Sequence, residues 1–236
     1  MARVAPPLRA TLGSISSRIT AKLCFRYPHR VESKKVLGVL AGRDLAPGAL
    51  EAWLSWADLV VAADGGADLC RAAGREPDKI VGDLDSISNP AGLTPDKDQD
   101  SSDADKLLAY LIREGHQAVT LIGVEGDRLD HVLGTLYSCA RADVECLLVL
   151  RTGTGHVHRG PKVIHGMGMN RRMSLMPLGR CRVTAKGFRW SLDDAWLDPL
   201  GLVSLSNVAV DPTYELRVHE GALAVITNAT IDPCST

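Results

Sequence analysis

The sequence predicts an α/β protein, with a parallel-sheet N-terminal part followed by an all-β sandwich. Three observations support this. The 236 residues are 45% hydrophobic and 23% charged, within the globular range, with enough apolar material for a core. Between residues 36 and 150, short apolar runs alternate with amphipathic stretches. After Arg151 the helical period disappears, and glycine and proline punctuate short apolar segments.

The first part contains alternating strand and helix units with continuous apolar strands, which indicates a parallel sheet covered on both faces. The predicted elements are, in order, strand 36–41, helix 48–55, strand 58–63, helix 66–73, strand 79–81, helix 103–114, strand 118–123, helix 129–141 and strand 144–150. Ligands of such sheets bind beyond the carboxyl ends of the strands. Aromatic residues supply only 4% of the chain, so the core is expected to be mostly aliphatic.

The second part contains β-rich segments of the kind found in a small antiparallel sandwich or barrel. They cover residues 162–166, 171–177, 181–190, 201–208, 214–219 and 222–227. We place the boundary between the two parts near Thr152 to Gly160. The predicted organisation is therefore a basic extension over 1–35, an α/β catalytic domain over 36–151 and a β-sandwich domain over 152–236.

The first 35 residues carry eight basic side chains against one acid, Glu32, which leaves 19 basic and 27 acidic residues, a net charge of −8, for the rest. The segment is rich in arginine and serine and lacks the apolar block of a secretory signal, as organellar transit segments do. It is equally typical of a flexible extension or of a start codon placed too far upstream. We expect it to be flexible and infer no function from it.

Composition excludes several classes of function. The apolar runs are strand-length, far short of the roughly 20 residues that cross a bilayer, so we expect no membrane partner. A negative body argues against nucleic acid as a partner. The six cysteines show no CxxC spacing and indicate reduced thiols, hence a cytoplasmic protein. Walker A, GxGxxG and GxSxG patterns are absent from the sequence.

The densest chemical feature is acidic. Asp83 and Asp85 directly follow the strand that ends at Val81, at the edge of the sheet where ligands bind. Five more aspartates follow within ten residues: Asp96, Asp98, Asp100, Asp103 and Asp105. Converging carboxylates repel one another unless a divalent cation neutralises them, and Mg²⁺ bridges carboxylates to substrate phosphates. This pattern predicts a Mg²⁺ site.

The run from 96 to 105 is also typical of a solvated loop that caps the next helix. In that alternative Ser102 is the N-cap and Asp105 reaches back to it. The pair Asp83 and Asp85 at a strand end favours the metal.

Two further blocks lie where a strand ends and a helix begins. In the first, Asp64 precedes Gly65 and Gly66, whose backbone N–H groups can approach an anion, although such a glycine pair also serves simple close packing. In the second, which runs from Gly123 to His131, Arg128 can grip a phosphate. The alternative makes Asp127 a helix N-cap and leaves Arg128 and Asp130 as surface charge.

All these blocks lie where strands of a parallel sheet end. Their residue types therefore predict a cleft that binds a polyphosphate through Mg²⁺, a basic side chain and backbone amides.

The order of the motifs resembles the thiamine pyrophosphokinase family, from about Val36 to Thr227. The matching segments are Ala63–Ala67, Gly82–Ser86, Asp98–Asp103 with Lys106, Gly126–His131, Gly187–Trp190 and Ser204–Asn207. The resemblance implies an α/β catalytic domain, a β-sandwich domain and a homodimer. It also implies Mg²⁺-dependent transfer of the diphosphoryl group of ATP to the hydroxyl of thiamine, which gives thiamine diphosphate and AMP.

The resemblance also implies roles for single residues. Three aspartates would hold Mg²⁺ and act in catalysis with Arg128: Asp83, Asp85 and Asp103. The nucleotide and its phosphates would be lined by Asp64, Gly65, Gly66, Gln99, Asp100, Ser102, Lys106, Arg128, Asp130 and His131. The sandwich of the partner subunit would offer thiamine Trp190, Ser204, Ser206 and Asn207.

Two of these roles have alternatives. The ring of Trp190 suits the thiazolium cation or stacking on the pyrimidine, but a tryptophan in an aromatic-poor sandwich also serves as core filling. The proton of the thiamine hydroxyl would pass to Asp103 or Asp85, and a carboxylate bound to Mg²⁺ is a poor base.

The sequence departs from the family at several positions, among them Ser101 or Ser102, where threonine is common in the family. Glu125 and Asp127 replace an aliphatic residue and a glycine, which adds two acids beside the phosphate site, where they could change the Mg²⁺ dependence or the nucleotide preference. Leu205 replaces a hydroxyl residue and puts a pyrimidine contact in doubt. The rival functions are a pterin-alcohol pyrophosphokinase of the same superfamily and a non-catalytic thiamine or nucleotide sensor.

Overall fold

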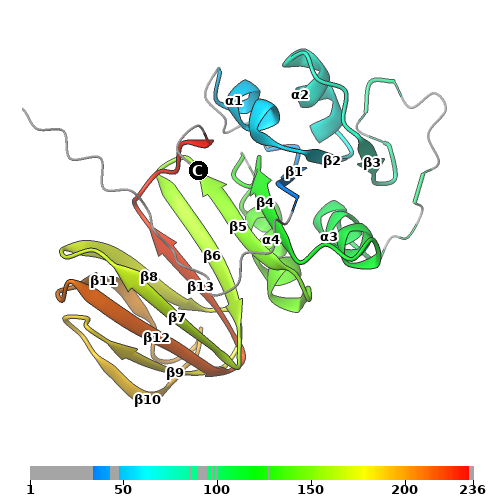
Figure 1. The fold of residues 1–236 in the computed structure, drawn as a ribbon. Coiled ribbons are helices and arrows are strands. Elements are labelled where there is room, and N and C mark those ends of the chain that lie inside the picture. The colour runs from blue at the N-terminus through cyan, green and yellow to red at the C-terminus, as the bar shows by residue number, and fades with distance from the viewer. Residues whose placement is uncertain are drawn as a thin grey trace, which may run out of the picture.

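The computed structural model describes residues 34–42, 48–85, 87–89, 95, 96, 98, 100–126 and 128–233 (Figure 1). Of the predicted extension, only its last two residues fall within this set, so the prediction for it lies outside the described residues. Gln99 and Asp127 also lie outside them. The two-domain division stays a prediction.

The N-terminal part is a five-stranded parallel sheet in the order β5-β4-β1-β2-β3. Its strands are β1 (Val36–Val39), β2 (Leu59–Ala63), β3 (Lys79–Val81), β4 (Ala118–Ile122) and β5 (Glu145–Leu150). Its helices are α1 (Ala49–Trp56), α2 (Gly66–Ala72), α3 (Asp103–Arg113) and α4 (Leu129–Arg141). The chain order reverses between β1 and β4, and ligands of open parallel sheets bind beside such a reversal.

Helices cover both faces of this parallel sheet. One core joins buried residues of α3 and α4 to alternate strand positions such as Val61 and Leu121. The other joins α1 and α2 to the opposite face, with Leu37 and Val60. Leucine dominates the largest fully buried side chains, and none of them is aromatic, in agreement with the prediction of an aliphatic core.

The C-terminal part is antiparallel. Its strands are β6 (Gly153–Arg159), β7 (Lys162–Met167), β8 (Arg171–Pro177), β9 (Cys181–Lys186), β10 (Leu192–Leu197), β11 (Ser204–Ala209), β12 (Thr213–Glu220) and β13 (Ala222–Thr227). Four of them extend the first sheet, which runs β11-β8-β13-β6-β5-β4-β1-β2-β3, and the others form a second sheet, β10-β9-β12-β7. A separate apolar core includes Met173, Val183 and Leu216. The protein is thus mixed α/β with a distinct antiparallel part.

Two segments differ from the sequence prediction. The predicted boundary near Thr152 to Gly160 contains β6, which pairs with β5 on one side and β13 on the other. Its glycines and histidines have weak strand preference, so neighbouring strands decide its conformation. The predicted segment 181–190 ends as a strand at Lys186, and the acidic segment that follows forms β10.

The described part of the chain contains no helix long and apolar enough to cross a membrane. Among the described residues the cysteines are buried free thiols, namely Cys70, Cys139, Cys146 and Cys181.

Candidate active site

Three carboxylates meet at the carboxyl edge of the parallel sheet. Asp64 follows β2, Asp83 follows β3, and Asp103 is the first residue of α3. One oxygen from each lies within 4.8 Å of the others. Because β2 and β3 are neighbouring parallel strands, their carboxyl ends bring Asp64 and Asp83 to the same edge.

The loops that carry these carboxylates approach one another closely and contain residues with positive φ. Asp64 has a left-handed φ of 44°, and its N–H donates to the carbonyl of Val81 at 2.8 Å. Gly82 has φ 132°, and a Cβ there would lie 3.1 Å from the Cβ of Asp64 and 3.3 Å from Oδ1 of Asp103. Only glycine allows the loop after β3 to approach both aspartates this closely.

The group carries an excess of negative charge. Burial, with the neighbouring carboxylates of Asp64, Asp83 and Asp85, raises the pKa of Asp103 to about 6, although the ammonium of Lys106 opposes the shift. The Lys106 side chain is buried and its Nζ donates to the carbonyl of Asp96 at 3.1 Å. One ammonium does not neutralise this group.

These residues fit a divalent cation. The donors are all carboxylate oxygens, the type that Mg²⁺ prefers, and the raised pKa of Asp103 reflects charge that a cation at this position would relieve. Converging carboxylates at a strand edge can therefore hold a metal and, through it, phosphate oxygens.

Asp85 lies outside the group of three. Its side chain is exposed, and its backbone N–H donates to Oδ1 of Asp83 at 3.4 Å. The structure therefore brings Asp83 and Asp103 together with Asp64 and leaves Asp85 beside them. The assignment of Asp85 to the metal stays a prediction.

The acidic loop caps α3 as the alternative predicted, and it also contributes a carboxylate to the group of three. Ser102 caps α3 in a full capping box with Asp105, whose Oδ1 also accepts from Arg141 of α4 at 2.7 Å. Asp103, next to the cap, points instead into the carboxylate group. Asp100 is exposed, and its N–H donates to Asp98.

The glycine pair after Asp64 is explained by packing at Gly66. A Cβ there would lie 2.3 Å from the carbonyl oxygen of Val39, so the start of α2 approaches β1 more closely than any other residue allows. Gly65 is the N-cap of α2, with no side chain to cap it. Binding of an anion by the backbone N–H groups of Gly65 and Gly66 stays a prediction.

The block after β4 is mostly at the surface. Arg128 and Asp130 form an exposed ion pair of 2.6 Å, and His131 is exposed. Glu125 is hydrogen-bonded to a different segment: its carboxylate accepts from the backbone N–H of Arg151, in the turn between β5 and β6. The extra acid predicted beside the phosphates is thus used in part to support that turn.

The predicted thiamine-facing residues gather at the far edge of the antiparallel part. Trp190, in the loop between β9 and β10, is 55% exposed, so its alternative as core filling is wrong. Asn207 of β11 is fully buried and donates to the carbonyl of Trp190 and to Oγ of Ser204. Ser206 is exposed beside them.

The two groups of predicted residues lie at opposite edges of one sheet. β3 is its last strand on one side and β11 on the other, eight strand spacings apart. At about 4.8 Å per spacing this is roughly 38 Å. In Figure 1, β3 and α3 lie on one side of the molecule and β11 on the other.

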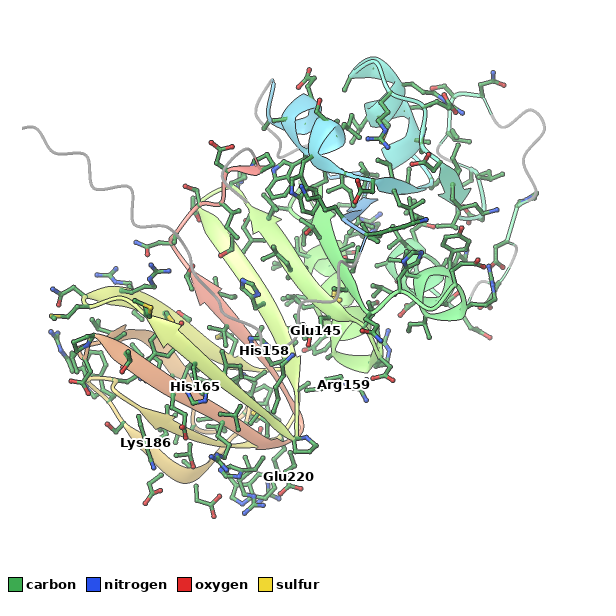
Figure 2. All side chains as sticks on the ribbon, viewed as in Figure 1. Glu145, His158, Arg159, His165, Lys186 and Glu220 are labelled. Carbon is green, nitrogen blue, oxygen red and sulfur yellow. The ribbon has the colours of Figure 1, made fainter. Side chains whose placement is uncertain are left out.

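A hollow of about 530 Å³ lies elsewhere, against β7, β9 and β12. Figure 2 labels two of its lining residues, His165 and Lys186, on the antiparallel part. It contains none of the predicted site residues, so the candidate site does not coincide with it.

The places of Asp64 and Asn207 were not predicted. Asp64 was expected to line the nucleotide, and its place beside Asp83 follows from the pairing of β2 with β3, which a single sequence does not show. For Asn207 no signal was available, because its orientation depends on an irregularity in β11.

Comparison with known families gives two matches. Residues 50–149 match the family described as thiamin pyrophosphokinase, catalytic domain, and residues 162–223 match thiamin pyrophosphokinase, vitamin B1 binding domain. Both candidate groups lie within these ranges.

Two individual relatives carry the same family name. Thiamine pyrophosphokinase 1 of rice (Oryza sativa subsp. japonica) is 28% identical over 165 residues, which is 60% of this chain and 62% of the relative. Thiamine pyrophosphokinase 3 of rice is 29% identical over 161 residues, 56% of this chain and 58% of the relative. The matches thus span about three fifths of these relatives.

Solved structures share the fold. Thiamine pyrophosphokinase from Bacillus subtilis superposes with a TM-score of 0.66 at 21% identity and covers 84% of this chain and all of its own. The yeast enzyme gives 0.64 at 17% identity, covering 85% of this chain and 88% of its own.

Proposed function

This chain belongs to the thiamine pyrophosphokinase family, and from that premise we propose that it transfers the diphosphoryl group of ATP to the hydroxyl of thiamine. The products would be thiamine diphosphate and AMP. The observation that carries the proposal is the group of three carboxylates at the carboxyl edge of the sheet, inside the range that matches the catalytic domain. A dense anionic group suits phosphate chemistry through a cation.

The proposed metal is Mg²⁺, held by Asp64, Asp83 and Asp103, with Asp85 beside them. When bound, it would supply positive charge against the phosphate oxygens of ATP. Lys106 lowers the pKa of Asp103 and so helps to keep the group ionised for the metal.

The proposed nucleotide positions surround this edge. Backbone N–H groups at Gly65 and Gly66 and the guanidinium of Arg128 would hold phosphates. The other positions come from the family resemblance: Gln99, Asp100, Ser102, Asp130 and His131. Arg128 is paired with Asp130 at the surface, so it would exchange a carboxylate for a phosphate when ATP binds.

In the reaction the hydroxyl oxygen of thiamine forms a bond to the β-phosphorus of ATP. The bond from that phosphorus to the oxygen bridging it to the α-phosphorus breaks, and AMP leaves. We assign the hydroxyl proton to Asp85, because Asp64, Asp83 and Asp103 would be committed to the cation and Asp85 lies next to them. In-line positioning and charge neutralisation supply most of the acceleration in such reactions.

The thiamine positions Trp190, Ser204 and Ser206 would act in the site of a second copy. The separation of roughly 38 Å between the two sheet edges supports this, because one chain cannot close that distance. Exposed apolar side chains near each region, Leu205 on β11 and Leu129 on α4, also favour contact between copies. We therefore propose a homodimer with the active site at the subunit interface.

We propose the cytoplasm as the compartment, supported by the free thiols of the described cysteines. Thiamine and ATP are the proposed small-molecule partners, with neither nucleic acid nor membrane among them.

The test is an assay of purified protein with ATP, Mg²⁺ and thiamine, with products separated by chromatography. We expect AMP and thiamine diphosphate in equal amounts, and no AMP when Mg²⁺ is chelated. ADP as the product, or turnover with a pterin alcohol and not with thiamine, would contradict the proposal. Binding of thiamine or ATP without any turnover would favour the sensor.

A further inference from the structure

Asn207 is buried at an otherwise exposed place in the antiparallel part. Its side chain is 0% exposed, while Leu205 and Ser206 just before it are exposed. The pairing of β11 with β8 shifts between Ser204 and Asn207, and Ser206 has a left-handed φ of 52°. This bulge turns the Asn207 side chain into the protein.

The amide of Asn207 is saturated by hydrogen bonds within the chain. Its Nδ2 donates to the carbonyl of Trp190 at 2.8 Å and to Oγ of Ser204 at 3.1 Å. Its Oδ1 accepts from the N–H of Trp190 at 3.2 Å and from its successor, Val208, at 2.8 Å. An asparagine amide offers two donors and two acceptor sites, so no capacity is left for a ligand.

These bonds hold both backbone polar groups of Trp190. The neighbouring Arg189 N–H donates to the carbonyl of Val208 at 2.8 Å, and Ser191 Oγ donates to the carbonyl of Phe188 at 3.1 Å. The Trp190 ring is thus presented to the outside from a backbone that is fixed before any ligand arrives. Fixing a contact residue in advance reduces the entropy lost on binding.

We propose that Asn207 is a positioning residue that acts on thiamine through Trp190 and does not touch thiamine itself. This inference rests on the proposed function, in which Trp190 faces thiamine. It moves Asn207 out of the set of contact residues that the family resemblance implies.

The first experiment uses Asn207→Asp, which keeps the shape and both acceptor sites but replaces the Nδ2 donors by an oxygen that repels the Trp190 carbonyl. We expect KM for thiamine to rise about tenfold, in keeping with the cost of one buried polar mismatch. KM for ATP should stay within about twofold, because Trp190 is proposed to face thiamine, whereas the phosphates of ATP are proposed to be held by residues of the other chain. Asn228→Asp, at an exposed position, is the matched control and should change neither constant.

The second experiment separates positioning from contact by a double-mutant cycle with Trp190→Ala. If Asn207 acts only through Trp190, Asn207→Asp adds less than about twofold to the thiamine KM of Trp190→Ala. If the two effects multiply in full, Asn207 touches thiamine independently and the inference is overturned. An unchanged thiamine KM in Asn207→Asp alone overturns it as well.

A measurement on the wild-type protein covers the case in which Asn207→Asp does not fold. Hydrogen exchange of the Asn207 side-chain amide, followed by NMR, should show protection before thiamine is added and little change afterwards. Rapid exchange that becomes slow only when thiamine binds would overturn the inference. If the wild type turns over no thiamine at all, the proposed function fails. Slow exchange of the Asn207 amide would still show that it is hydrogen-bonded to the Trp190 backbone.

Discussion

The two parts of the molecule place their candidate residues by different means. In the parallel part, Asp64 and Asp83 reach one edge because neighbouring parallel strands end there, so topology alone brings them together. In the antiparallel part, Asn207 reaches its partners only through a bulge and a left-handed serine.

The difference extends to how charge is handled. The parallel part concentrates carboxylates whose repulsion a cation would relieve, with Asp103 as the residue most affected. The antiparallel side of the long sheet instead buries two neutral imidazoles, His156 and His158 of β6, stacked with centroids 5.9 Å apart. One region therefore gathers like charges, and the other buries titratable groups in their neutral form.

The largest expected effect follows from removing one carboxylate. Asp83→Asn should lower kcat at least about a hundredfold, because it removes one carboxylate from the group proposed to hold the cation that neutralises the transferring phosphate. Circular dichroism should be unchanged, and without Mg²⁺ the unfolding temperature should not fall. Asp143→Asn, at a carboxylate 96% exposed, is the control and should keep full activity. Full activity of Asp83→Asn would make the acidic edge ordinary surface.

Mixing this variant with Trp190→Ala tests whether the two regions of different chains share one site. At a thiamine concentration far below the thiamine KM of Trp190→Ala, each variant alone should be nearly inactive. A mixed dimer has one site with both regions intact, which restores up to about a quarter of the activity after random exchange. A mixture that stays inactive although mixed dimers form would mean that each chain completes its own site.

The second prediction concerns acid and the β6 histidines. Burial lowers the pKa of His156 to about 4 and that of His158 to about 3, from a usual 6.5. Their stabilising contribution is complete above pH 6.5 and falls as the pH drops toward 4, because only the unfolded chain takes up the protons. The expected loss is about 1.4 kcal/mol per histidine for each pH unit.

Urea unfolding between pH 7 and pH 4.5 measures this slope. His158→Gln should reduce the slope by about one proton, while His165→Gln, at an exposed ring of the outer face, should leave it unchanged. Figure 2 labels both residues, His158 on β6 and His165 on β7, which belong to different sheets. An equal slope in His158→Gln and the wild type would mean that other groups control acid unfolding.

Most strands and helices of the parallel part could be predicted from the sequence. Continuous apolar runs predicted β1 to β5 and amphipathic stretches predicted four helices, and the predicted helix 129–141 has the bounds of α4. These elements are local, since their own side chains decide which face is buried. Strand β6 was missed because its glycines and histidines become buried only through pairing with β5 and β13.

The same limit applies to the candidate site. Asp83 and Asp103 were predicted because strand ends and helix starts can be recognised one at a time. Their meeting with Asp64 depends on the order of strands in space, and the inward turn of Asn207 depends on a positive φ at a residue that is not glycine. Neither property leaves a pattern in a single sequence.

The smallest expected effect concerns stability at the carboxylate edge, and it has the opposite pH sign to the histidines. The pKa of Asp103 is raised in the folded protein, from 3.8 to about 6. Its favourable contribution is therefore complete below pH 3.8 and is lost as the pH rises through 6. Without Mg²⁺ at pH 7.5, Asp103→Asn should unfold with a free energy about 1 to 2 kcal/mol higher than the wild type, allowing for solvent screening.

The difference in unfolding free energy between Asp103→Asn and the wild type should vanish near pH 4, where the folded wild-type carboxyl is protonated and uncharged. It should reverse when Mg²⁺ is added at pH 7.5, because a cation that binds only the folded wild type stabilises it by mass action. Asp143→Asn should show neither change. If Asp103→Asn were more stable than the wild type both with and without Mg²⁺, the carboxylates would hold no cation. The contrast between an ion-dependent edge and a neutral β6 would then lose its basis.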